Sequence, residues 1–202
     1  MVGDSWTHRM ARAVIRPLVG GPITPNHLTT ARLLTGVAAC GAFAMGDPRW
    51  TFWGGVGWIV SAFLDRADGE LARLGGTCSP SGHAYDYACD VAVNGLFFAA
   101  IGVGLRHGDL GYAAVIMGLI AGISVVAASL LSERLERVEG GDKKAYEGRW
   151  GFDFDDVLYL FGPIAWLGWL YPLLLGASIG APLFAIWTWL RLRRISWLRS
   201  SD

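Results

Sequence analysis

Apolar residues along the chain gather in six runs separated by short polar stretches. Each run approaches the ~20 residues that a helix needs to cross the hydrocarbon layer of a membrane. The second and third runs reach that length only if their helices continue into the polar stretch between residues 65 and 90. The predicted spans are roughly Leu28–Met45, Trp50–Leu64, Val91–Leu105, Leu110–Leu131, Val157–Leu175 and Ile179–Leu192.

A shorter amphipathic pattern precedes the first run. Its apolar residues recur at helical spacing and alternate with basic ones, which predicts a juxtamembrane helix on the membrane surface within residues 1–19. Glycines and a proline at 20–22 end it, and Thr24-Pro25 is expected to begin the next helix. No repeat or linker divides the chain, so we expect one domain over residues 1–202, with a six-helix bundle over 26–198. The apolar positions of the surface helix are Trp6, Met10, Ala13, Val14 and Leu18.

Composition agrees with this pattern. Hydrophobic residues make up 53% of the chain, the mean hydropathy is +0.39, and 17% of residues are charged, against about 25% in soluble domains. The formal net charge is zero, so no global basic field suggests nucleic acid as a partner. The predicted fold is an all-α integral membrane protein with six transmembrane helices, preceded by an N-terminal amphipathic surface helix.

The basic residues predict the orientation of these spans. With six spans and the N-terminus inside, the outer loops are residues 46–49, 106–109 and a turn after Tyr171. Of the 17 lysines and arginines only Arg49 and Arg106 fall there, and the other 15 are expected on the opposite side. Basic loops face the cytoplasm, so we expect a multi-pass protein of the cell (inner) membrane with both termini cytoplasmic.

Four aspartates mark the polar stretch between the second and third runs. Asp65 and Asp68 lie three residues apart, and Asp86 and Asp90 lie four apart, spacings that place each pair on one helix face. A reversal near residues 75–80 would fold the two helices antiparallel, so that the four carboxylates converge. Small residues on the same faces would leave room between the two backbones.

Placing four carboxylates close together within the membrane costs free energy unless cations bind to them. An aspartate at the centre of a spanning helix costs about 2.5–3.5 kcal/mol on insertion scales, and facing carboxylates repel one another. A salt-bridge network with Arg66 and Arg73 supplies two cations against four acids, which does not balance. Two Mg²⁺ or Mn²⁺ ions would neutralise the cluster, and carboxylate oxygens suit these hard ions. Paired metals are typical of displacement at phosphorus, and Arg73 offers a phosphate a fixed positive charge.

The full spacing resembles the signature of the CDP-alcohol phosphotransferase (CDP-alcohol phosphatidyltransferase) family, matched here at every fixed position: D-x2-D-G-x2-A-R-x8-G-x3-D-x3-D. The resemblance implies six membrane helices with a surface helix before them, a site open to the cytoplasm, two Mg²⁺ or Mn²⁺ ions, release of CMP, and a homodimer. It also implies CDP-diacylglycerol and an alcohol acceptor as substrates, within phospholipid biosynthesis.

Residue roles follow from that resemblance. Asp65, Asp68 and Asp86 would hold the first metal, Asp65, Asp86 and Asp90 the second, and Asp90 would act as general base on the acceptor hydroxyl. Asn26 and Thr29 resemble the family's Asn/Asp-x-x-Thr segment, although Asn26 also suits a helix cap. The residues expected to contact the CDP moiety are Asn26, Thr29, Gly69, Ala72, Arg73, Ser79 and Gly82.

Basic residues follow the fourth span and have two interpretations. They could form a pocket for the phosphate of an acceptor such as inositol phosphate or glycerol phosphate, or they could reflect only the positive cytoplasmic side and its anionic lipids. The acids at residues 153–156 are a weaker candidate for a second metal site. The acceptor candidates are Arg134, Arg137, Lys143, Lys144 and Arg149.

Other functions stay open at this point. A transferase could move a phosphopolyol from a CDP-polyol to a lipid acceptor, which reverses the roles of the two substrates. A membrane prenyltransferase also uses aspartate-bound Mg²⁺, but the four acids here lie within 26 positions instead of in two distant clusters. An ion-coupled transporter would leave the Gly-x-x-Ala-Arg spacing unexplained, and the sequence has no visible broken-helix repeat.

Overall fold

All the elements that the structure describes are helices. The structure is a computed structural model that describes residues 6–139 and 154–199. The helices are α1 (Trp6–Ile15), η1 (Arg16–Leu18), α2 (Pro25–Ala44), α3 (Pro48–Gly75), α4 (Pro80–Gly104), η2 (Leu105–His107), α5 (Tyr112–Glu139), η3 (Phe154–Leu160), α6 (Phe161–Trp166) and α7 (Leu170–Arg199).

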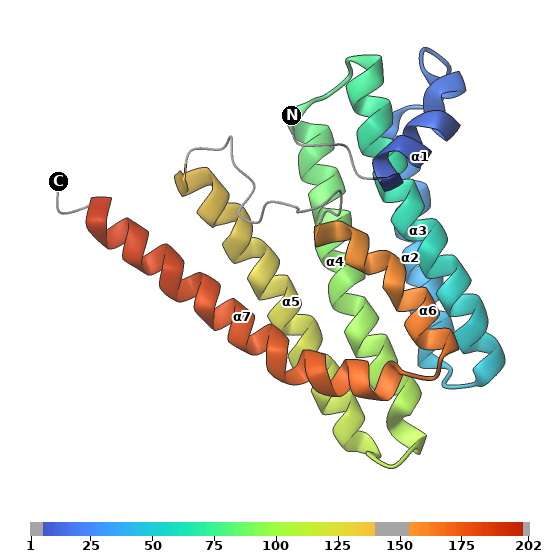
Figure 1. Cartoon of the computed structure of the whole chain (residues 1–202), viewed down its shortest axis with the longest axis vertical. Coiled ribbons are helices and arrows are strands. Elements are labelled where there is room, and N and C mark those ends of the chain that lie inside the picture. Colours follow the sequence, from blue (N-terminus) through green and yellow to red (C-terminus); the bar gives the residue numbers. More distant parts are fainter. Residues whose placement is uncertain (1–5, 140–153, 200–202) are drawn as a thin grey trace.

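The long elements alternate in direction, as Figure 1 shows. Helices α2, α4 and α6 run one way, and α3, α5 and α7 run the other. Both ends of the described chain therefore lie on one side of the bundle, together with α1 and the α3–α4 turn. Helix α7 leans outward from the bundle and packs mainly along α5 (Figure 1).

The sequence defines the helix starts through local caps. Thr24 caps α2, with Pro25 in its first turn and the His27 ring accepting from the Thr24 N–H at 3.2 Å, which confirms the predicted start. The Asp47 side chain accepts from the Arg49 N–H at 2.9 Å ahead of α3. Ser79 accepts from the Gly82 N–H at 3.1 Å ahead of α4. Each cap satisfies a backbone donor that the first helical turn leaves open.

Aromatic side chains form the centre of the bundle. Phe97 of α4 stacks on Phe161 of α6 with ring centroids 4.8 Å apart, and Trp58 of α3 lies 4.2 Å from the same Phe97 ring. Helices α4 and α5 cross so closely that a Cβ on Gly102 would lie 2.5 Å from the Ala114 carbonyl oxygen. Small residues at this crossing allow the close backbone contact that membrane helices commonly use.

The backbone of α2 packs closely against both α3 and α4, whereas the backbones of α3 and α4 stay further apart and meet through their side chains. The prediction that the carboxylates converge from two adjoining helices was therefore incomplete. Small residues at Gly69, Ala72 and Gly82 keep a space open between the two helices, and α2 closes one side of it. This arrangement brings α2 side chains into the predicted site.

The last two predicted spans have different boundaries in the structure. The chain turns at Gly168, whose φ of 73° suits glycine, and α7 then continues without a break through residues 175–179, so the turn predicted after Tyr171 was misplaced. The element before the turn, η3 with α6, is shorter than the ~20 residues of a full span. Among the described residues, the helices long and apolar enough to cross a membrane are Pro80–His107, Tyr112–Val138 and Leu170–Ile195.

Candidate active site

Three of the predicted carboxylates meet between α3 and α4. Asp65, Asp86 and Asp90 each offer one oxygen, and these atoms all lie within 4.8 Å of one another. All three residues are half-buried. The Oδ1 atom of Asp86 is buried and has no hydrogen-bond partner among the described residues. A buried acceptor without a donor is costly, and oxygen donors converging in this way fit a divalent cation such as Mg²⁺ or Mn²⁺.

Arg32 of α2 reaches the same cluster, and the sequence analysis missed it. Its Nε lies 2.9 Å from Asp65 Oδ1, and its Nη2 donates to Asp90 Oδ1. Arg32 is only 2% exposed. It lies inside the first predicted span, Leu28–Met45, and the sequence analysis counted it only among the basic residues expected on the cytoplasmic side. A charged residue within an apolar run is itself a sign of a functional partner, and that signal could have identified Arg32.

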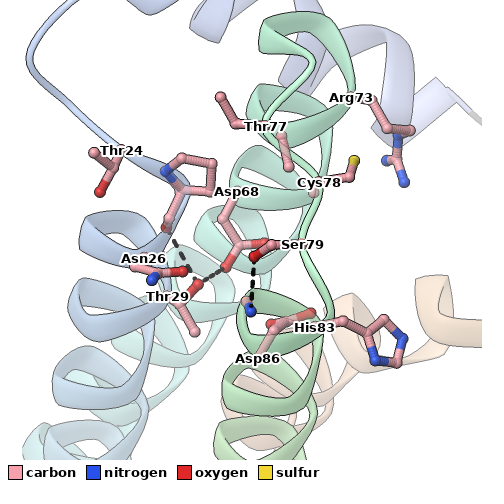
Figure 2. Close-up of a pocket in the computed structure, with 14 residues that line it drawn as sticks. Thr24, Asn26, Thr29, Asp68, Arg73, Thr77, Cys78, Ser79, His83 and Asp86 are labelled. Atoms are coloured by element: carbon pink, nitrogen blue, oxygen red, sulfur yellow. Dashed lines mark hydrogen bonds between the residues drawn. The ribbon is translucent and has the colours of Figure 1, made fainter.

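Asp68 lies one turn along α3 from Asp65 and is held differently. Its Oδ2 accepts a buried hydrogen bond of 2.6 Å from the Thr29 hydroxyl of α2. Figure 2 shows this contact beside Asp86, which lies across the cavity on α4. Thr29 thereby joins α2 to the aspartate face of α3. The assignment of Asp68 to a first metal stays a prediction.

A cavity of about 380 Å³ opens between α2, α3 and α4, on the same side of the bundle as α1. It is bounded by the α2 start, the α3–α4 turn and the aspartates, as Figure 2 shows. The lining residues for which the sequence analysis gave no role at the nucleotide include Thr24, Pro25 and Thr77. All seven residues predicted to contact the CDP moiety line it: Asn26, Thr29, Gly69, Ala72, Arg73, Ser79 and Gly82.

The polar lining of this cavity suits a nucleotide. Arg73 is 54% exposed at the cavity and can point its charge toward a phosphate. Gly69 and Gly82 present backbone without side chains. Ser79 caps α4, so its structural role and its place in the cavity coexist.

Arg73 is also tied to helix α1 through Glu70. The buried Glu70 carboxylate accepts from Arg73 Nη2 at 2.7 Å and from Arg12 Nε at 2.9 Å, and it lies 2.8 Å from Nδ1 of His8. Burial alone would raise the pKa of Glu70, but the hydrogen bonds from Arg12, Arg73 and His8 lower it to about 2. The carboxylate is therefore ionised at neutral pH and fixes α1 next to the nucleotide cavity.

The acids that open η3 serve a structural contact in the part that the structure describes. Asp156 is buried and accepts from Thr7 of α1 at 2.6 Å and from Arg66 of α3 at 3.1 Å. The side chains of Asp153 and Asp155 lie outside the described residues. Asp156 thus links α1, α3 and η3, and it lies apart from the carboxylates that converge between α3 and α4.

Asp90 lines a second cavity, of about 450 Å³. His83 lines both cavities, so it stands between them. Arg134 and Arg137, two of the candidates for an acceptor phosphate, are exposed on α5 and line neither cavity. Lys143, Lys144 and Arg149 lie outside the described residues.

Comparisons with known proteins agree with this geometry. The sequence profile described as CDP-alcohol phosphatidyltransferase matches residues 22–189. Two crystal structures of the phosphatidylinositol phosphate synthase of Mycobacterium tuberculosis have the same fold. One, with CDP-DAG bound, is 22% identical, has a TM-score of 0.60, and matches over 94% of this chain and 90% of that chain. The other, in complex with manganese and citrate, is 23% identical with a TM-score of 0.62, over 95% and 88%. No curated protein matches the chain in sequence.

Proposed function

Because the chain belongs to the CDP-alcohol phosphatidyltransferase family, and is therefore a membrane phosphotransferase, we propose that it moves a phosphatidyl group from CDP-diacylglycerol to an alcohol, with release of CMP. One observation carries the proposal. The cavity lined by the seven predicted nucleotide contacts is also lined by Asp68 and by Asp86 of the carboxylate cluster. The nucleotide and the reacting phosphorus would then lie side by side.

Each side chain has a role in this proposal. Asp65, Asp68, Asp86 and Asp90 would hold two divalent ions, Mg²⁺ or Mn²⁺, as the manganese complex of the fold relative supports. Bound there, the metal ions would stabilise charge on the phosphate oxygens. Arg73 would orient the CDP phosphates, and Asp90 would take the proton of the acceptor hydroxyl as its oxygen attacks the diacylglycerol-side phosphorus and the bond to CMP breaks.

The acceptor in this proposal is a polyol or a polyol phosphate. The reversed arrangement, in which a CDP-polyol donates its phosphopolyol to a lipid, uses the same nucleotide cavity and carboxylates. The fold relative that carries CDP-DAG favours the first arrangement. The basic residues at 134–149 stay candidates for an acceptor phosphate, although Arg134 and Arg137 line neither cavity.

We also propose how the enzyme sits in the cell. The alternating helices bring the site to the side of the bundle where both described ends lie (Figure 1), and the basic residues put that side in the cytoplasm. The six crossings, the inner-membrane location, the single domain over 1–202 and the homodimer belong to this proposal.

The reverse reaction tests the proposal. Purified protein given CMP, Mn²⁺ and a phospholipid product should regenerate CDP-diacylglycerol, because every step of the transfer is reversible. A prenyltransferase or an ion-coupled transporter has no use for CMP. If neither the forward nor the reverse reaction depends on the cytidine nucleotide, the proposed function is wrong. Incorporation of labelled CMP into CDP-polyol instead would identify the reversed arrangement.

A further inference from the structure

A third cavity lies where α1 and η1 pack against the end of α3, and its polar lining is basic. Its volume is about 680 Å³, and it lies with α1 at the end of the bundle that carries the α3–α4 turn (Figure 1). The residues of this arginine groove are Arg9, Arg12, Ala13, Arg16, Val19 and Leu74. None of the six lines the nucleotide cavity, so the proposed phosphatidyl transfer gives the groove no role.

The three arginines share one face of the N-terminal helix. They follow one another at three- and four-residue spacing, and no acid lines the groove among the described residues. Arg12 Nε donates to Glu70 at 2.9 Å, whereas Arg9 and Arg16 are exposed and form no ion pair with a described residue. Because like charges repel, the groove favours an anion, and the planar guanidinium suits the paired oxygens of a phosphate.

Apolar side chains complete the groove and indicate that this phosphate belongs to a lipid. Val19 is 36% exposed and Leu74 43% exposed in the lining, and Met10 and Val14 are exposed on the adjoining face of α1. Apolar surface left in water costs free energy, which acyl chains would relieve. The groove also lies where helices long enough to cross a membrane end (Figure 1), the level at which headgroups meet the hydrocarbon.

We propose that the arginine groove binds the phosphate of an anionic phospholipid from the surrounding membrane. Arg9 and Arg16 bind the phosphate oxygens, Arg12 stays on Glu70, and the apolar residues contact the first carbons of the acyl chains. The bound lipid fixes α1 on the membrane surface. This inference does not depend on the proposed function, because the lipid is not a substrate and its binding is measured without CDP-diacylglycerol.

Local quenching of a fluorophore tests the proposal in a bilayer. The fluorophore is attached to Met10→Cys in a Cys78→Ser background, since Cys40 and Cys89 are buried. Full-length protein is reconstituted in phosphatidylcholine with nitroxide-labelled phosphatidic acid or nitroxide-labelled phosphatidylcholine. We expect phosphatidic acid to reach half-maximal quenching at a mole fraction at least tenfold lower, because arginines near a membrane surface attract anionic lipid. Equal quenching by the two lipids would overturn the proposal.

Two double variants separate a site from general attraction. Arg9→Gln with Arg16→Gln should abolish the advantage of phosphatidic acid. The matched control is Arg193→Gln with Arg194→Gln, which removes two exposed charges near the end of α7 on the same side of the bundle (Figure 1) and should keep that advantage. Equal losses in both would show attraction to positive charge alone and overturn the site. Displacement of the lipid by excess inorganic phosphate would show that the groove takes free phosphate instead.

A substitution inside the groove tests the location without removing an arginine. Ala13 is exposed and lies four residues after Arg9 and three before Arg16, spacings at which helical side chains pair. Ala13→Glu would therefore occupy both guanidinium groups with a built-in carboxylate, and we expect it to abolish the advantage of phosphatidic acid. Ala13→Gln, of the same size without the charge, should keep it and controls for folding. Wild-type quenching in Ala13→Glu, or equal losses in both variants, would overturn the assignment of the lipid to this groove.

Discussion

Arg32 gives the carboxylate cluster a fixed positive charge from a third helix. Its guanidinium reaches Asp65 and Asp90 at once, so it holds α3 and α4 in register on α2 and offsets repulsion between their acids. Divalent ions that bind the cluster would share these oxygens with Arg32. Arg32 is therefore a positioning residue for the carboxylates. Removing it would leave two half-buried acids uncompensated, which we expect to cost less than the ~3–5 kcal/mol typical of a fully buried pair.

Asp90 is proposed to act both as a metal ligand and as the general base. Asp90→Asn keeps the shape and one oxygen but removes the basic site, so we expect CDP-diacylglycerol binding within about twofold of wild type and a loss of CMP release of at least 10²-fold, the lower range for general-base catalysis. Binding and turnover should be measured on the same preparation. Turnover at near wild-type rate would show that the base lies elsewhere.

Helix α1 lies beside the nucleotide cavity and is linked through Glu70 to Arg73, which lines that cavity. Its Thr7, Ala11 and Ile15 face the protein, while Met10 and Val14 remain exposed, as expected for a helix whose apolar face rests on lipid. That surface location stays a prediction. The pKa of Glu70 is lowered to about 2 from 4.5, so the docking of α1 is fully present above about pH 4.5 and is lost only as the pH falls toward 2.

Removing the charge of Glu70 should therefore change the position of the Arg73 side chain. We expect Glu70→Gln to raise KM for CDP-diacylglycerol severalfold with little change in kcat, because Arg73 loses the ion pair that positions it. Arg73→Ala should cost about 1.5–3 kcal/mol of nucleotide-lipid affinity, as for a hydrogen bond to a charged group. The double variant should be no weaker than Arg73→Ala alone. Additive losses would mean that the two residues act independently.

The helices also show which features of the fold and the site the sequence patterns predicted and which they missed. The family resemblance supplied the seven predicted nucleotide contacts, and all seven line one cavity. Helical spacing explains why Gly69, Ala72 and Arg73 share a face of α3. Hydropathy placed the last two spans poorly, because the turn at Gly168 and the unbroken α7 lie within apolar sequence. The packing of α2 against both aspartate helices depends on tertiary structure that no local pattern records, although the charge of Arg32 inside an apolar run was a local sign of a partner.

At the scale of the whole molecule, the two ends of the bundle carry different features. The nucleotide cavity, α1 and the α3–α4 turn lie at one end, and the loops at residues 45–47, 105–111 and 167–169 lie at the other (Figure 1). Apolar side chains cover much of the outer surface between them. On α5 and α7 the exposed ones include Ile116, Ile123, Leu183, Ile186 and Leu190, which suits contact with lipid.

Cysteine labelling tests this orientation. Cys78 is exposed and lines the nucleotide cavity, whereas His107 is exposed at the opposite end. A membrane-impermeant thiol reagent should label Cys78 only in inverted vesicles, and CMP should slow that labelling. His107→Cys, in a Cys78→Ser background, should be labelled only in right-side-out cells. Labelling of both positions from the same side would contradict the topology.

Metal dependence of CMP release tests the central claim, that converging carboxylates on α3 and α4 hold the ions for phosphatidyl transfer. Purified protein with CDP-diacylglycerol and an alcohol should release no CMP in excess chelator and regain activity with added Mn²⁺ or Mg²⁺. Asp86→Asn should stay inactive at every metal concentration, because the Asp86 oxygens lie with those of Asp65 and Asp90. Undiminished CMP release in chelator, or full activity of Asp86→Asn, would contradict the account.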